Sequence, residues 1–265
     1  MTPGLLGQAL PVHAITTAGP APLAWGSDQY GQTGLPASTY GPESPHVVGG
    51  INDVTAVAAG SEHSLALRAD GTVWAWGSDA SGELGDGATT DSSSPVRTVG
   101  LPAVTAIAAG NGFSLALTSD GAVWGWGDDT SGELGDNHVR TISAVPVQAI
   151  GLPQVVAIAV GSGTSLALAA DGTVWAWGAG PCVNSAEPVQ LHLAGLTGIV
   201  AIAAGGDHAL AIGPGGSLWA WGDNGFGDLG NGGAAADCSS AVQPIGLSGA
   251  VAISAGTYHS VRPRG

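Results

Sequence analysis

The chain has 265 residues, a net charge of −15, 46 glycines and no lysine, and its five basic residues are all arginines. So few cations exclude a basic surface for DNA or RNA and disfavour binding to an anionic membrane, whereas a 44% hydrophobic content argues against disorder. No apolar run reaches the length of a membrane span.

Residues 1–21 are predicted to be a lead-in segment before a single domain at 22–265. The first residues, MTPGLLGQALPVHAITTAG, lack the positively charged start of a signal peptide, so the chain is expected to be cytoplasmic. Its two cysteines are too few for a disulfide framework.

A tryptophan motif, W-x-W-G or the shortened LAWG, recurs five times along the chain. Its last tryptophan falls at Trp25, Trp76, Trp126, Trp177 and Trp221. An apolar stretch precedes it, such as AVAAGSEHSLAL at 56–67, and a related stretch, AISAGTYHSV, stands at 252–261. Self-similarity at about fifty residues predicts a repeat architecture.

One repeat is predicted to contain four strands. The apolar segment at 54–60 is followed by an alternating one at 63–69, and Asp70-Gly71 is a strong signal for a two-residue hairpin into TVWAWG at 72–77. A proline-containing segment at 93–99 supplies the fourth strand. Four antiparallel strands in each repeat are typical of a propeller blade.

The two ends of the repeat array are complementary. PLAWG at 22–26 corresponds to a third strand and GTYHSV at 256–261 to a second strand. We therefore predict an all-β β-propeller of about five four-stranded blades. Its N- and C-terminal strands are expected to share one blade and to close the ring, which removes exposed sheet edges.

The A-G-x-x-H-S-L-A-L and W-x-W-G-x-x-x-x-G-x-L-G signatures resemble the regulator of chromosome condensation repeat family over residues 22–262. Members of that family usually have seven blades, so five would be a departure. In loop character the chain is similar to a bacterial member, the propeller-type beta-lactamase inhibitory protein. This resemblance implies that Tyr30, Phe226 and Tyr258 contact a protein target.

The repeated tryptophans and carboxylates are interpreted as architecture. Trp74 and Trp76 lie two positions apart, so both face one side of a strand, where they suit packing between blades. Glu83 and Glu133 stand in glycine-rich loops without the alternating D-x-D-x-D spacing of a calcium site. No metal ion and no cofactor are predicted.

The histidines that recur in the repeat are also interpreted as structural. His63, His208 and His259 share one repeat position, which Phe113 and Thr164 occupy in the other repeats. A position that accepts Phe and Thr does not form a set of metal ligands.

Function is assigned to the loops at one end of the propeller, where the turn before the repeat histidine and the loop after W-x-W-G are expected to meet. Aromatic and acidic side chains in such loops favour a protein-binding surface. The predicted contact residues are Tyr30, Glu62, Asp207, Phe226 and Tyr258. The predicted partner is a protein or peptide, and the negative charge favours a cationic one.

The alternative hypothesis is an enzyme that acts on a small molecule in the central pocket of the same face. Its reactive groups would be Cys182, His138, Asp207 and Asp223, from different blades. No nucleophile and base stand at a recognisable spacing. Cys182 and Cys238 could form a bond, remain as thiols or include a nucleophile.

Overall fold

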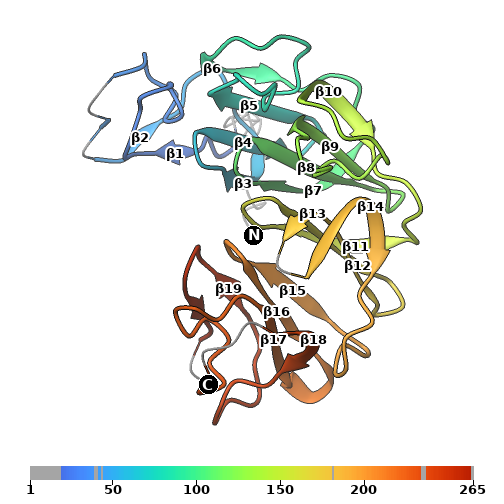
Figure 1. The fold of residues 1–265 in the computed structure, drawn as a ribbon. Coiled ribbons are helices and arrows are strands. Elements are labelled where there is room, and N and C mark those ends of the chain that lie inside the picture. The colour runs from blue at the N-terminus through green and yellow to red at the C-terminus, as the bar shows by residue number, and fades with distance from the viewer. Residues whose placement is uncertain (1–18, 39–40, 43, 181, 234–236, 264–265) are drawn as a thin grey trace, which may run out of the picture.

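The computed structural model describes residues 19–38, 41–42, 44–180, 182–233 and 237–263. In this part of the chain four four-stranded antiparallel sheets follow one another around an arc, with a two-stranded sheet at each end (Figure 1). The end sheets are β1 (Leu23–Ala24) with β2 (His46–Val47), and β19 (Ser254–Ala255) with β20 (Ser260–Val261). The prediction of repeated four-stranded blades is confirmed.

The four complete blades are built in chain order. The first contains β3 (Val54–Ala59), β4 (His63–Arg68), β5 (Val73–Gly77) and β6 (Ser92–Arg97). The second contains β7 (Val104–Ala109), β8 (Phe113–Thr118), β9 (Val123–Asp128) and β10 (Ile142–Gln148). The third contains β11 (Val155–Val160), β12 (Thr164–Ala169), β13 (Val174–Gly180) and β14 (Val183–Gln190). The fourth contains β15 (Ala201–Ala204), β16 (His208–Ile212), β17 (Leu218–Gly222) and β18 (Asp237–Val242).

The predicted Asp-Gly hairpin turn joins the middle strands of a blade. Between β4 and β5, Gly71 adopts φ +78°, and Asp70 accepts hydrogen bonds from the backbone N–H and the hydroxyl of Thr72 at 3.1 and 2.6 Å. Glycine tolerates this positive φ, and the short acid holds the turn, which explains the choice of residues.

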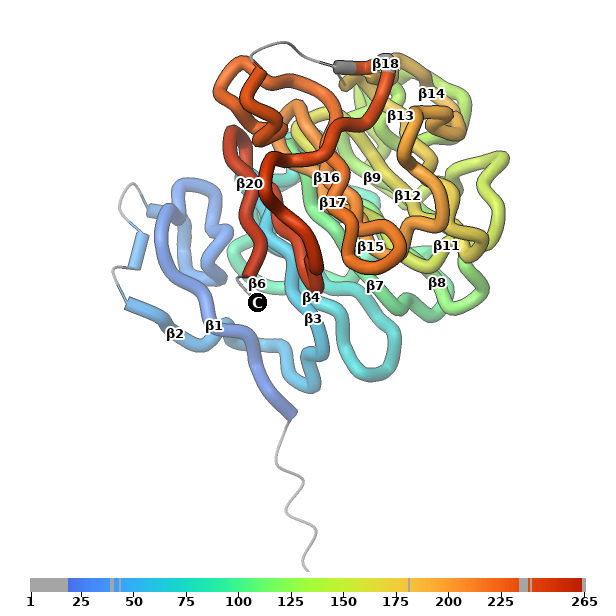
Figure 2. Tube along the Cα trace, turned by 90° about the horizontal axis from the view of Figure 1, so that it is seen from below, coloured from blue at the N-terminus to red at the C-terminus, as the bar shows by residue number. Residues whose placement is uncertain are grey.

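The closing of the ring is where the prediction is wrong. Among the described residues β1 pairs with β2 and β20 pairs with β19, but β1 and β20 do not pair with each other. The terminal strands therefore form two separate half-blades rather than one shared blade, at the two ends of the arc (Figures 1 and 2). The reason is geometric: the arc leaves the two half-blades apart, so their edges do not meet.

Several neighbouring blades are joined by a contact that we call the carbonyl clamp. A backbone carbonyl in the loop after the W-x-W-G strand of one blade accepts two hydrogen bonds from the next blade. In the second blade, the indole Nε1 of Trp126 and the hydroxyl of Ser114 both donate to the carbonyl of Glu83, at 2.7 and 3.1 Å. The adjacent Leu84 is fully buried in the same inter-blade core.

Among the described residues, both hydrogen bonds of the carbonyl clamp are present at three junctions, the first of which joins the N-terminal half-blade to the first complete blade. The carbonyl of Gln32 accepts from Ser64 and Trp76, and that of Glu133 accepts from Ser165 and Trp177. The last tryptophan of the motif is 0–3% exposed in all four complete blades. The interpretation of these tryptophans as architecture is confirmed.

No helix in the described part of the chain is long and apolar enough to cross a membrane.

Candidate interaction face

The turn before the repeat histidine and the loop after W-x-W-G meet at one end of each blade, as predicted. In the first complete blade the amide of Ser78 donates to the carbonyl of Glu62 at 2.9 Å, and in the fourth the amide of Asp223 donates to that of Asp207 at 2.7 Å. One face of the arc therefore carries both sets of predicted contact loops.

The buried acids of these loops hold the loop backbone. Asp79 accepts hydrogen bonds from the amides of Leu84 and Thr90, and Glu83 accepts from the amide of Ser81 at 2.7 Å. Burial raises the pKa of Asp79 to about 7 and also raises the pKa of Glu83. No cluster of three potential metal-ligating side chains is found among the described residues. These carboxylates serve the architecture.

The repeat histidines link blades. His63 is buried, its Nε2 lies 2.9 Å from the hydroxyl of Ser114 in the next blade, and burial lowers its pKa to about 4. His208 makes the equivalent contact with Ser260 at 2.9 Å, and burial lowers its pKa too. The interpretation of these two side chains as structural agrees with their positions.

We expect His63→Phe to remove part of the loss of stability at acidic pH. The replacement should fit, because Phe113 fills the same repeat position in the next blade. A histidine whose pKa falls from 6.5 to about 4 on folding stabilises the native state above pH 6.5, and this stability is lost as the pH falls toward 4. The wild type should lose roughly 1–2 kcal/mol at pH 5 through this group.

The measurement is urea unfolding of both proteins at pH 7.5, 6 and 5. Asp79 acts in the opposite sense, because its raised pKa favours the native state at low pH, so the difference between wild type and variant is the readout. His138→Gln, at a 70% exposed side chain, is the control. An equal pH dependence for wild type and His63→Phe would contradict the assignment.

The two exposed aromatic side chains predicted near the C-terminal end contact each other. Phe226, in the loop after β17, is 73% exposed and Tyr258, in the turn between β19 and β20, is 58% exposed. Their ring centroids lie 5.0 Å apart with an interplanar angle of 59°. Asp207 and Asp223 belong to the joined loops of the same blade. The structure thus brings Phe226 and Tyr258 into contact. Asp207 lies on the adjacent turn, where the amide of Gly206 donates to the carbonyl of Thr257, but Asp207 itself lines the crevice between the third and fourth blades.

Tyr30 and Glu62 lie at the other end of the arc. Tyr30 is half-buried in the loop between β1 and β2, and its amide donates to the side chain of Gln32. Gln32 also approaches the backbone of Gly77 next to Glu62. The five predicted contact residues therefore form two groups rather than one surface.

Phe226 and Tyr258 border a groove with a volume of about 300 Å³. Apolar side chains from β16, β17 and the segment after β18 contribute to it, namely Leu210, Leu218, Pro244 and Leu247. Asp228, His259 and Arg262 supply polar groups. Leu247 stands at the repeat position of Leu101 and Leu152, so the period marks it as part of the blade and gives no sign of a groove specific to this one.

The central pocket does not gather the residues of the alternative enzyme hypothesis. Its volume is about 300 Å³, and its described lining consists of Ala, Gly, Ser, Asn, Val and Thr, without a titratable side chain. Cys182 forms a disulfide with Cys238. His138 is an exposed residue beside Asp136 on the loop after β9. The catalytic set of Cys182, His138, Asp207 and Asp223 is therefore not assembled there, because its members lie in separate loops.

Comparison with known proteins gives one family. The RCC1-like domain matches residues 21–262. Protein pim1 of Schizosaccharomyces pombe is 33% identical over 78 residues, which are 24% of this chain and 14% of that protein. The RCC2 homolog of Danio rerio is 36% identical over 87 residues, which are 32% of this chain and 17% of that protein.

Solved structures show the same fold. Human WBSCR16 superposes with a TM-score of 0.80 at 28% identity, over 88% of this chain and 65% of that one. Prp20p from Saccharomyces cerevisiae superposes with a TM-score of 0.74 at 25% identity, over 92% of this chain and 65% of that one. Its structure was described with its binding properties to Gsp1p and histones. Yeast RCC1 (Prp20) bound to Kap60 superposes with a TM-score of 0.77 at 24% identity, over 99% of this chain and 67% of that one. The chain spans about two thirds of the length of these structures.

Proposed function

Because this chain belongs to the RCC1-like domain family, we propose that it is a protein-binding propeller. It contacts a basic segment of its partner through the loops at the C-terminal end of the arc. The proposal takes residues 22–265 as one propeller domain. The observation that carries the proposal is the exposed pair of Phe226 and Tyr258 beside an apolar groove.

Aromatic side chains supply much of the binding energy of protein interfaces when they border a pocket that a partner can fill. Phe226 and Tyr258 are held by a ring contact rather than by burial, so most of their surface remains available to a partner. The groove beside them is large enough for one apolar side chain of a peptide. These features favour a peptide-sized contact with an apolar anchor.

The charge of the chain supports a basic partner. The net charge is −15, and Asp207 is exposed on the turn beside the one that carries Tyr258. Opposite charges at the rim of an interface accelerate association and select partners, and an arginine can also stack on an exposed aromatic ring. A segment with Arg or Lys on each side of an apolar residue fits this combination.

One relative, yeast Prp20, binds proteins according to the titles of two structures: it was solved bound to Kap60, and it was described with its binding to Gsp1p and histones. These partners belong to the yeast protein. They support a protein partner for this chain and leave its identity to experiment.

The test is selection of binding peptides from a random 12-residue library, followed by calorimetry with one enriched peptide. We expect enriched peptides to combine basic residues with an apolar one. Phe226→Ala/Tyr258→Ala should weaken their binding about 10- to 100-fold, since both rings are in the contact. The affinity of the wild type should fall as salt is raised.

Val139→Ala is the matched control, because Val139 is 64% exposed on a different blade and should not affect binding. Tyr30→Ala tests the other end of the arc separately, and is expected to bind as the wild type does. Equal affinities for the wild type and the Phe226/Tyr258 double variant, or selection of acidic peptides, would overturn the proposal.

A further inference from the structure

Among the described residues, the junction between the third and fourth blades has no carbonyl clamp. The segment after β13 is shortened, so that β14 begins three residues after β13 ends. At the repeat position of the donating serine stands Ala209, and the indole of Trp221 makes no hydrogen bond among the described residues. The fourth blade therefore keeps the tryptophan but lacks the serine, and no described residue of the third blade offers the tryptophan an accepting carbonyl.

A disulfide lies at the corresponding place. Cys182 stands just before β14 of the third blade, Cys238 lies in β18 of the fourth, and their Cα atoms are 5.0 Å apart. At the other junctions the loop also reaches the fourth strand of the next blade. The amides of Gly87 and Asn137 donate there to the carbonyls of Ala144 and Ala186. A covalent bond thus occupies the position of these hydrogen bonds.

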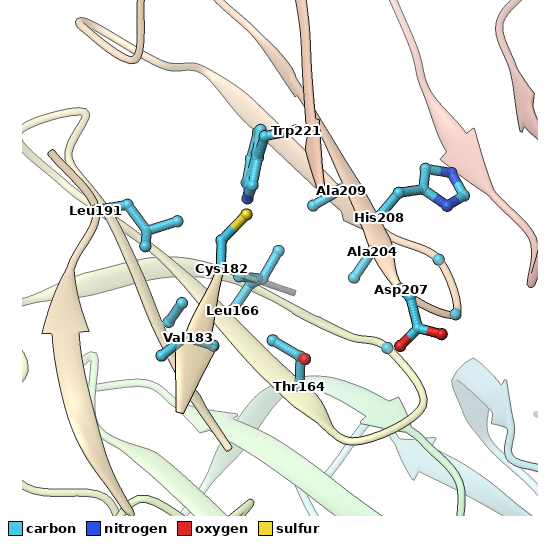
Figure 3. A pocket seen from close by; sticks show the side chains of 14 residues that line it. Thr164, Leu166, Cys182, Val183, Leu191, Ala204, Asp207, His208, Ala209 and Trp221 are labelled. Atoms are coloured by element: carbon cyan, nitrogen blue, oxygen red, sulfur yellow. The ribbon is translucent and has the colours of Figure 1, made fainter. Parts of the chain in front are cut away.

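The residues around the disulfide agree with the replacement of inter-blade hydrogen bonds by a covalent bond. Leu191 takes the repeat position of Thr98, whose hydroxyl donates to the loop carbonyl of Leu84 in the first complete blade. Leu191, Val183 and Trp221 enclose a narrow apolar crevice into which Cys182 projects, with its sulfur toward the indole (Figure 3). The disulfide is the covalent link across this junction, beside a hydrogen bond from the amide of Ala241 in β18 to the carbonyl of Ala194 and the shared apolar core.

The disulfide is accessible to a reductant. Cys238 is exposed, and Cys182 is half-buried on the wall of the crevice. A thiolate can therefore attack Cys238 without prior unfolding of a blade. Sulfur in such a position differs from an inert disulfide buried in a core.

From these contacts we infer that Cys182–Cys238 is a thiol–disulfide exchange site that clamps the fourth blade to the third. A dithiol attacks the disulfide, a mixed disulfide forms, and the second thiol of the reductant releases it. The protein gains two electrons and two protons as two thiols, and the reductant leaves as its disulfide. Reduction separates β14 from β18 and opens the crevice beside Trp221, whereas the three carbonyl clamps are unchanged.

The experiment compares hydrogen exchange and thermal unfolding of the purified full chain with and without dithiothreitol. The bond closes a loop with a sequence separation of 56 residues, so reduction should lower the thermal midpoint by several degrees. Exchange in β18 should accelerate by roughly 30-fold or more, and exchange in β6 and β10 should stay the same. The double variant Cys182→Ser/Cys238→Ser should match the reduced wild type and ignore the reductant.

Ser165→Ala, which removes one hydrogen bond of a carbonyl clamp, is the matched control for the junction. It should lose stability equally with and without dithiothreitol while retaining the full response of the wild type to reduction. Two free thiols in protein purified without reductant would overturn the inference. It would also fail if reduction left β18 unchanged or loosened β6 and β10 to the same extent.

Discussion

Trp126→Ala should destabilise the protein by about 3–5 kcal/mol, the range for removing a large aromatic side chain from a core. Trp126 is completely buried between the first and second complete blades, where it contacts the core cluster that includes Leu65 and Leu84. Its removal leaves a cavity and also leaves the carbonyl of Glu83 with one donor fewer. The measurement is urea unfolding followed by circular dichroism.

Trp25→Ala is the matched control, because Trp25 belongs to the same motif but is 61% exposed. Its replacement should cost less than about 1 kcal/mol, as for most exposed positions. Trp126→Phe keeps most of the buried area and removes the indole N–H, so it should fall between the two and remain folded. Similar losses for Trp25→Ala and Trp126→Ala would show that burial between blades is not the source of the stability.

Gly127→Ala should destabilise the protein by about 2–4 kcal/mol through backbone strain and a steric clash. Gly127 ends the W-x-W-G motif of the second blade with φ +103°. A Cβ atom there would lie 2.4 Å from the carbonyl oxygen of Gly112 and 2.7 Å from the Cα of Phe113. Both are backbone atoms held by the strand pairing of β8 with β9, so they cannot move aside cheaply.

Gly26→Ala separates the two causes. Gly26 has nearly the same conformation, φ +106°, but a Cβ atom there would have no neighbour within 4 Å. Only the conformational strain remains, and a cost of about 1–2 kcal/mol is expected. Thermal unfolding of both variants is the measurement. Equal losses would assign the whole effect to φ and none to the clash.

The blade architecture could be predicted from the sequence because its signals are local. The Asp70-Gly71 turn, the alternating strands and the tryptophan motif each act over a few residues and recur at a regular period. Closure of the ring depends on the angle between successive blades. Small differences in packing add up around the arc, and no short stretch of sequence encodes their sum.

The candidate site was predictable only in part, for the same reason. The end of the blade that carries the loops follows from the strand order, and Phe226 and Tyr258 are visible there as aromatic residues outside the repeat motif. Their contact and the separation of Tyr30 from them depend on the arc as a whole. The two cysteines lie outside the motif as well, so their pairing could not be derived from the period.

The disulfide bears on the cellular compartment in which the protein functions. Bonds of this kind persist in oxidising compartments and are rare in the cytosol, where they are usually transient or redox-sensing. The cytoplasmic location drawn from the first residues therefore stays a prediction, and the bond between Cys182 and Cys238 weighs against it unless the bond is a redox sensor.

The carbonyl clamp has a direction. In each case the accepting loop belongs to the earlier blade and the donating serine and tryptophan to the later one. A ribosome releases the earlier blade first, so each newly made blade meets a docking surface that is already complete. Synthesis and assembly then run in the same order, and a partly made chain exposes one growing edge instead of several.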